Sequence, residues 1–167
     1  GALASLCVLY GWPVQAQQQA VPPPAPVWQE IFARPASIPS PAGNPVSTER
    51  AALGARLFTD TRLSGAEDRS CASCHQPTRA FTDGRPRARP LDGRTMLPNT
   101  PAIFDLAWAK RFHWDGRHPT LEAQARAPIV HPQELAGSLE QTARRLRKDP
   151  DMQARFAAAF PATRRIS

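Results

Sequence analysis

The residues Cys71-Ala-Ser-Cys74-His75 have the types and the spacing that covalent attachment of a haem requires. Cysteines three positions apart on a helical turn project from the same side, so both thiols can reach the vinyl groups of one porphyrin. The imidazole of His75 then binds the iron as its proximal ligand. A structural zinc site would need four ligands, and no second cysteine pair is present. A redox cysteine pair would accompany a βαβ pattern, which the sequence lacks, so we interpret the motif as a haem c site.

The amino-terminal residues resemble an export signal. Ala2 to Val14 form an apolar stretch that is followed by Gln15 and Ala16, and the first charged residue is Glu30. An apolar core of this length before small residues is typical of a secretory signal peptide, and it is too short for a membrane span. The stretch has no initiator Met and no positive region before it. We therefore expect residues 1–16 to be a truncated signal peptide and the mature protein to be periplasmic.

The remaining residues suffice for one domain with one hydrophobic core. The chain carries a net charge of +7, and all of its charged residues lie beyond the signal. Four arginines at positions 85, 87, 89 and 94 lie among prolines, without the interleaved aromatic residues of a single-strand nucleic-acid platform. A periplasmic location also argues against nucleic acid as a partner. Two interpretations stay open: a solvated basic face, or electrostatic steering of an acidic electron-transfer partner.

The sequence predicts an all-α domain with long loops and few or no strands. Residues 17–45 are rich in Gln and Pro and are expected to form a linker, with residues 21–26 in extended polyproline conformation. The domain is expected to cover residues 46–167, with residues 76–101 as a long irregular loop. We expect a short helical turn at the haem motif and four capped helices. These begin at Ser47 or Thr48, at Thr120 (ending before Pro128), at Ser138 (ending near Lys148) and at Asp149-Pro150, the last with Met152, Phe156 and Phe160 on one face.

Motifs that flank the haem-binding residues narrow the interpretation. They occur in order along residues 46–165: Leu53-Gly54, Leu57-Phe58, Arg62-Leu63-Ser64, Ala80-Phe81-Thr82-Asp83-Gly84, Asn99-Thr100-Pro101, Phe112-His-Trp114-Asp115-Gly116-Arg117, Leu121-Glu-Ala-Gln124, Pro128-Ile129 and Pro132-Gln-Glu134. Together they resemble the amino-terminal haem domain of the bacterial di-haem cytochrome c peroxidase and MauG family. The resemblance implies a cytochrome c-like fold and a peroxidatic haem held by Cys71, Cys74 and His75.

The resemblance also implies that Gln124 and Glu134 lie on the open side of the iron. A carboxylate there can accept a proton from one peroxide oxygen and return it to the other, and an amide can orient the peroxide by hydrogen bonding. The residues alone favour other interpretations, namely a surface carboxylate for Glu134 and an exposed helix position for Gln124. The order and spacing of the family motifs favour the catalytic pair.

Two further residues acquire roles only through the resemblance. Trp114 corresponds to a tryptophan between two haems that could help electrons to pass, and its alternative is a buried aromatic residue in a loop corner. Arg117, in an Asp-Gly-Arg turn, could pair with a haem propionate, and its alternative is an exposed arginine.

The sequence departs from the family at the sixth iron position. Residues 82–98 contain no His, although family members that need reductive activation have a distal His in this loop. Met96 is the only soft side chain in this loop and is a candidate for a distal ligand. His113, His118 and His131 are secondary candidates, and each is interpreted as a loop residue rather than as a ligand. We expect an open or water-bound sixth position, as in the MauG-like branch.

The expected function is peroxide chemistry at a haem. The first hypothesis is reduction of hydrogen peroxide to water with electrons from a small c-type cytochrome or cupredoxin. One alternative is a MauG-like enzyme that oxidises residues of a protein substrate, and another is a mono-haem electron-transfer protein. Family members continue into a second haem domain, so the resemblance implies a second haem in the full-length protein. A homodimer is a possible assembly.

Overall fold

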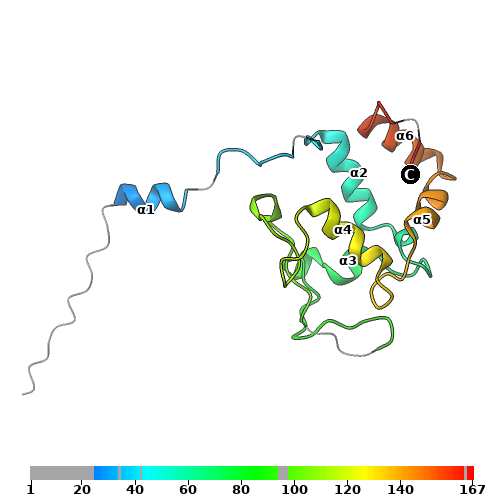
Figure 1. Ribbon diagram of the computed structural model, residues 1–167, viewed down its shortest axis with the longest axis horizontal. Helices are drawn as coiled ribbons and strands as arrows, with labels where there is room; N and C mark the ends of the chain where they lie inside the picture. The colour runs from blue at the N-terminus through cyan, green and yellow to red at the C-terminus, as the bar shows by residue number, and fades with distance from the viewer. Residues whose placement is uncertain (1–24, 34, 42, 94–97, 164) are drawn as a thin grey trace, which may run out of the picture. The chain divides into compact units, whose positions relative to one another are not determined.

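The computed structural model describes residues 25–33, 35–41, 43–93, 98–163 and 165–167 (Figure 1). The predicted signal peptide at residues 1–16 and the distal candidate Met96 lie outside these residues. The chain divides into two compact units, residues 1–37 and 38–167. None of the helices in the described ranges combines the length and apolar character needed to cross a membrane.

Where the structure describes the first unit, at residues 25–33 and 35–37, it has one short helix, α1 (Ala25–Ile31). Its occurrence corrects the expectation that the linker is extended through Pro26, because the helix includes that proline. Proline is tolerated in the first turn of a helix, where its missing N–H would have no partner. The rings of Trp28 and Phe32 stack with centroids 5.4 Å apart, one helical turn from each other.

The second unit is helical, as predicted. Its α-helices are α2 (Thr48–Phe58), α3 (Cys71–Cys74), α4 (Leu121–Val130), α5 (Leu139–Leu146) and α6 (Pro150–Ala159). Three short 3₁₀ turns, η1 (Thr61–Leu63), η2 (Pro77–Arg79) and η3 (Leu106–Trp108), lie between α2 and α4. The described residues form no strand beyond two isolated bridges, Gln76 with Thr82 and Phe112 with His118. The all-α prediction is therefore confirmed.

The four predicted helix starts are confirmed by side-chain caps. The oxygens of Ser47, Thr120 and Ser138 accept hydrogen bonds from backbone N–H groups at 3.2, 3.1 and 3.5 Å. Asp149 accepts two such bonds, from the backbone N–H groups of Asp151 and Met152. Each bond satisfies a donor that the first helical turn leaves unpaired.

The hydrophobic core lies between α2, α5 and α6. It consists of Leu53, Ala143, Leu146, Met152, Ala159 and Ile166, with Leu57, Phe156 and Phe160 packed against it. Met152 is fully buried in this cluster. Helices α2 and α6 pack directly against each other (Figure 1). The predicted apolar face of the last helix thus belongs to the core.

The predicted end of α4 before Pro128 is wrong, since the helix continues to Val130. Pro128 cannot donate the bond that Gln124 C=O would accept. Two contacts nevertheless secure the last turn. The N–H of His131 donates to Ala127 O at 3.1 Å, and the N–H of Leu135 donates to Pro128 O at 3.1 Å. The segment after α4 therefore holds the helix past its proline.

Charged side chains attach the segment before α3 to the core. Asp60 is buried and forms an ion pair with the Nη2 atom of Arg62. The Nη1 atom of Arg62 lies 2.8 Å from Oδ2 of Asp149, at the start of α6. The guanidinium of Arg145 on α5 donates to Arg62 O, Ser64 O and Gly65 O at 3.1, 2.8 and 3.0 Å. The core thereby fixes the course of the chain as it enters the haem motif.

Candidate haem site

Helix α3 holds the two thiols of the motif one turn apart. It begins after Ser70, whose backbone N–H donates to the hydroxyl of Ser73 at 3.0 Å. Cys71 and Cys74 are half-buried free thiols. Burial raises the pKa of both thiols, so they are neutral at neutral pH. The structure thus places the two cysteines as the spacing predicts.

The histidine of the motif has a defined orientation. The backbone N–H of His75 donates to Cys71 O at 2.9 Å, which continues the helical turn. Its ring Nδ1 lies 3.0 Å from Phe81 O. A carbonyl oxygen can only accept, so Nδ1 is the donor in this contact. A ring oriented in this way leaves Nε2 as the nitrogen that can bind a metal ion.

The loop after His75, which carries the Phe81 carbonyl, has a strained backbone. Ala80 and Phe81 adopt left-handed backbone conformations, with φ of 51° and 56°. Such conformations are unfavourable for residues with a side chain, by about 1–2 kcal/mol each. Backbone bonds hold the loop: Phe81 N–H donates to Gln76 O at 2.8 Å and Gln76 N–H to Thr82 O at 3.1 Å. The Phe-Thr-Asp-Gly motif was visible in the sequence, but its backbone role was missed because it depends on φ angles.

Glu134 lies in a turn that follows α4 and contacts the segment before α3. Its neighbour Leu135 accepts a bond from Gly65 N–H at 2.8 Å, and Gly137 N–H donates to Ile129 O at 2.7 Å. The two segments cross at glycines. A Cβ on Gly65 would lie 2.3 Å from Ala136 O, and one on Gly137 would lie 2.5 Å from Leu63 O. Only glycine permits such an approach, so this crossing fixes the turn that carries Glu134.

The Glu134 carboxylate is half-exposed and lies close to the haem motif. Its side chain is 37% exposed, and its Oε1 lies 3.6 Å from Nδ1 of His131. Burial is the main cause of the raised pKa of Cys74, and the negative charges of Asp83 and Glu134 add to it. The carboxylate is therefore within electrostatic range of α3 and can exchange protons with solvent.

Gln124 has a buried oxygen that no described residue satisfies. Its Oε1 is inaccessible to solvent and accepts no hydrogen bond within the described part of the chain. An unsatisfied buried acceptor costs about 1–3 kcal/mol. In native structures such a group is rare and marks strain, a catalytic role, or a place for a water or an ion. The alternative interpretation of Gln124 was an exposed helix position. The buried Oε1 does not agree with that alternative.

Trp114 and Arg117 lie in a separate loop. Trp114 is 57% exposed, which overturns the buried-aromatic alternative, and its indole N–H donates to Asn99 O at 3.0 Å. The guanidinium of Arg117 contacts three side chains: His113 Nε2 at 3.0 Å, His118 Nε2 at 3.4 Å and Asp115 Oδ2 at 3.5 Å. No described contact joins either residue to α3, so both roles stay predictions.

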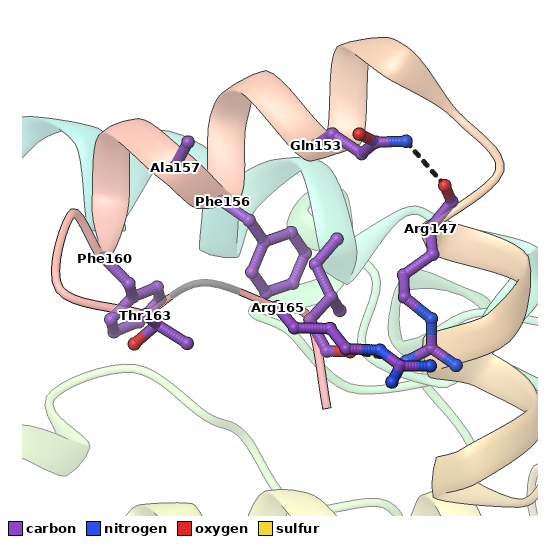
Figure 2. A pocket seen from close by; sticks show the side chains of 8 residues that line it. Arg147, Gln153, Phe156, Ala157, Phe160, Thr163 and Arg165 are labelled. Atoms are coloured by element: carbon purple, nitrogen blue, oxygen red, sulfur yellow. Dashed lines mark hydrogen bonds between the residues drawn. The ribbon is translucent and has the colours of Figure 1, made fainter.

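A pocket of about 310 Å³ at the carboxyl end lies away from this chemistry. It is lined by residues of α6 and the segments around it, and Gln153 Nε2 donates to Arg147 O across its rim at 2.6 Å (Figure 2). Phe156 points into it, and the side chains of Arg147 and Arg165 lie together on one side (Figure 2). No cysteine, histidine or carboxylate is among the described residues that line it. The pocket therefore lacks groups for haem attachment or proton transfer.

The residues around α3 fit a c-type haem. Two thiols one helical turn apart and an imidazole that presents Nε2 are the groups that such a cofactor would engage. The described residues contain no cluster of three or more acidic, cysteine or histidine side chains that could hold a bare metal ion. This donor set favours a porphyrin iron over a metal ion bound only by protein.

Comparison with known proteins supports the same conclusion. MauG, the methylamine utilization protein of Methylorubrum extorquens, is 45% identical over 130 residues, which cover 77% of this chain and 36% of that protein. The cytochrome c peroxidase Ccp of Escherichia coli is 34% identical over 124 residues, covering 74% and 27%. The crystal structure of a MauG-like protein associated with microbial copper homeostasis superposes with a TM-score of 0.71 at 38% identity, covering 81% of this chain and 41% of that one.

The likeness to solved structures confirms the cytochrome c-like fold. The chain spans less than half the length of the relatives it matches. The family model described as di-haem cytochrome c peroxidase matches residues 48–167, which include every described residue of the candidate site. Over this range the chain belongs to the di-haem cytochrome c peroxidase family, a family of oxidoreductases with c-type haem.

Proposed function

We propose that Cys71 and Cys74 attach a haem c, that His75 binds its iron, and that the domain reduces hydrogen peroxide to water. The electrons would come from a small redox protein such as a c-type cytochrome or a cupredoxin. The observation that carries this proposal is the 3.0 Å contact between His75 Nδ1 and Phe81 O, which leaves Nε2 for the iron. The haem supplies the redox chemistry when bound, and the protein supplies binding, orientation and proton transfer.

Glu134 is the proposed proton carrier. Reduction of hydrogen peroxide to two waters consumes two electrons and two protons, and it requires a proton to move between the two oxygens of the substrate. The carboxylate accepts the proton from one oxygen and returns it to the other. The ring of His131, whose Nδ1 accepts from Gln133 N–H at 3.3 Å, lies beside this carboxylate, with Nδ1 3.6 Å from Glu134 Oε1. Partial exposure of both side chains lets solvent replace the protons that are consumed.

Gln124 is the proposed orienting residue. Its buried Oε1 has no described partner, and the O–H of hydrogen peroxide is a donor that would satisfy it. The turn after α4 joins the two residues, because Leu135, adjacent to Glu134, donates to Pro128 one turn beyond Gln124. The amide would therefore fix the substrate on the element that also positions the carboxylate.

The test is replacement of Glu134 by Gln in the haem-loaded chain. Stopped-flow turnover of peroxide with a reduced c-type cytochrome should fall by about 10²-fold or more, because the amide cannot carry the proton. Glu140→Gln is the matched control, since the Glu140 side chain is 77% exposed on α5 and forms its ion pair with Arg144 on the same helix. An unchanged rate in Glu134→Gln would remove this carboxylate from the mechanism.

A MauG-like activity, oxidation of residues in a protein substrate, is the second candidate. It is favoured by the 45% identity to the MauG of Methylorubrum extorquens and by the lack of His in residues 82–98. The visible spectrum of the ferric protein distinguishes the two enzyme activities from the function of a simple electron-transfer protein. A high-spin spectrum that shifts with peroxide supports either enzyme, whereas a low-spin spectrum that ignores peroxide supports an electron-transfer protein. Oxidised residues in a partner, found by mass spectrometry after peroxide addition, would favour the MauG-like activity.

We also propose that the protein acts in the periplasm and that a second haem is present in the full-length protein. The first rests on the signal-like residues 1–16 and on the export that c-type haem attachment requires. The second rests on the length of the relatives, of which the matching region covers 36% in MauG and 27% in Ccp. Cell fractionation and the haem-to-protein ratio of the full-length protein test these two statements.

A further inference from the structure

A pocket of about 340 Å³ lies beside the second cysteine of the haem motif. Its polar lining includes Arg69, Ser73, Gln76, Arg85 and Arg89, and the Cys74 thiol lies in its wall. Arg69, from the segment before α3, and Arg85, from the loop after it, line the same pocket as Cys74. This is the part of the chain where three cationic side chains and a haem-attachment residue share one cavity.

Within the described residues, the ion pairs leave out the arginines of this pocket. The ion pairs of the described residues involve other arginines, and none includes Arg69, Arg85 or Arg89. The one carboxylate in the lining, Asp83, is buried and accepts from the backbone N–H of Arg85 at 3.1 Å. The lining thus carries three cationic side chains and one carboxylate. Such a cluster of guanidinium groups favours an anion, and carboxylates match their planar donor geometry.

The loop that carries two of these arginines is held in place. Pro86 and Pro90 restrict its backbone, and Leu91 N–H donates to Gln133 O at 2.9 Å in the turn that bears Glu134. At its other end, Gly84 N–H donates to Thr82 Oγ1 at 3.0 Å. A loop fixed at both ends loses little entropy when its arginines bind a ligand, so this pocket is preorganised.

We propose that the pocket formed by Arg69, Arg85 and Arg89 is a carboxylate-binding site next to the haem. The carboxylate has two sources with the same chemistry: the propionates of the haem itself, or a free carboxylate-bearing anion. Arg117, which the family resemblance suggested as a propionate partner, instead contacts His113, His118 and Asp115. The three pocket arginines are uncommitted and lie beside α3, so they are better placed for this role.

This inference rests on the proposed haem attachment but not on peroxide turnover. A haem-stained denaturing gel establishes attachment independently. Loss of turnover in Glu134→Gln would leave the carboxylate site intact, and loss of the carboxylate site would leave the turnover proposal standing. The two can therefore fail separately.

The test compares the double variant Arg85→Gln/Arg89→Gln with Arg87→Gln, both in the haem-loaded chain. Arg87 lies in the same loop, is exposed and does not line the pocket, so its variant changes the charge of the loop but not the site. Circular dichroism confirms that both variants keep their helices. Citrate is the probe for a free carboxylate, and calorimetric titration at low salt measures its binding. The ferric/ferrous midpoint potential reports on the haem propionates.

Either source gives a distinct result. If free carboxylates occupy the site, citrate binds saturably to the wild type and to Arg87→Gln, and about tenfold or more weakly to the double variant. If the propionates occupy it, citrate does not bind, and the midpoint potential falls in the double variant but not in Arg87→Gln, because unpaired propionate charges stabilise ferric iron. If the double variant and Arg87→Gln behave alike in both measurements, the proposal is overturned.

Discussion

The helical side and the haem side of the second unit are stabilised in different ways. Helices α2, α5 and α6 bury a shared apolar cluster around Met152. The haem side, from α3 to the loop before α4, consists of one four-residue helix, two 3₁₀ turns and residues with left-handed backbone conformations. It is held by backbone hydrogen bonds such as Phe81 N–H to Gln76 O.

The difference shows where this chain provides stability and where it provides chemistry. Apolar burial stabilises a fold without directing any polar group, at about 25 cal/mol per Å². The haem side and the adjoining helix α4 instead leave polar groups available, namely Nε2 of His75 on the haem side and the buried Oε1 of Gln124 on α4. The helical side supports this arrangement through Arg145, which holds three carbonyls of the segment leading to α3.

The largest expected effect concerns the haem side alone. Replacing Cys71 and Cys74 with Ala should abolish covalent haem completely, because no other thiol lies near the motif in the described chain. A haem-stained denaturing gel measures it. The single variant Cys71→Ala is the control and should keep a weaker stain through one thioether. Haem that stays attached in the double variant would refute the proposed attachment.

The next effect concerns the helical side alone. Met152→Ala leaves a cavity in the core and should lower the free energy of unfolding by about 2–5 kcal/mol. Met152→Leu conserves the volume and should cost less than about 1.5 kcal/mol. Urea denaturation measures both variants. The haem spectrum of Met152→Leu should match the wild type, since Met152 is fully buried among apolar residues. A changed spectrum would mean that Met152 binds the iron and that the two sides are not separate.

A smaller effect concerns the connection between the two sides. The hydrogen bonds from Arg62 lower the pKa of the buried Asp60 below its usual value of 3.8. The ionised Asp60 therefore contributes its full stabilisation of the folded state at pH values above 3.8. This contribution is lost as the pH falls through the lower pKa of the folded state. Asp60→Asn should lower the free energy of unfolding by about 1.5–3 kcal/mol at pH 7.

The difference between Asp60→Asn and the wild type should shrink in strong acid, where the wild-type carboxyl is protonated. Urea denaturation at neutral and at acid pH measures the trend. Asp151→Asn is the control, because the Asp151 side chain is 58% exposed and forms its ion pair with Arg155 on the surface of α6. A difference that stays constant with pH would mean that the ion pair contributes little.

The sequence predicted those features that depend on neighbouring residues. The helix starts at Ser47, Thr120, Ser138 and Asp149 were predictable because each cap bonds a backbone group two or three residues away. The haem motif was predictable for the same reason, since one helical turn contains it. The family resemblance added Gln124 and Glu134, which no local pattern distinguishes.

Features that depend on distant contacts were not predictable. The continuation of α4 through Pro128 requires a bond from Leu135, and the orientation of the His75 ring requires a left-handed Phe81. The pocket brings together Arg69, which precedes α3 in the sequence, and Arg85 and Arg89, which follow it. In each case the contact is made with a residue that only the folded structure identifies.

The crossing of Gly65 and Gly137 has a consequence for protein engineering. Because each glycine packs against a carbonyl of the other segment, the turn that carries Glu134 and the approach to α3 form one transplantable module. A designer who exchanged residues 131–137 with the equivalent turn of a relative would have to exchange residues 63–65 as well. Chimaeras that respect this boundary should keep the carboxylate in register with the haem motif, and chimaeras that divide it should not.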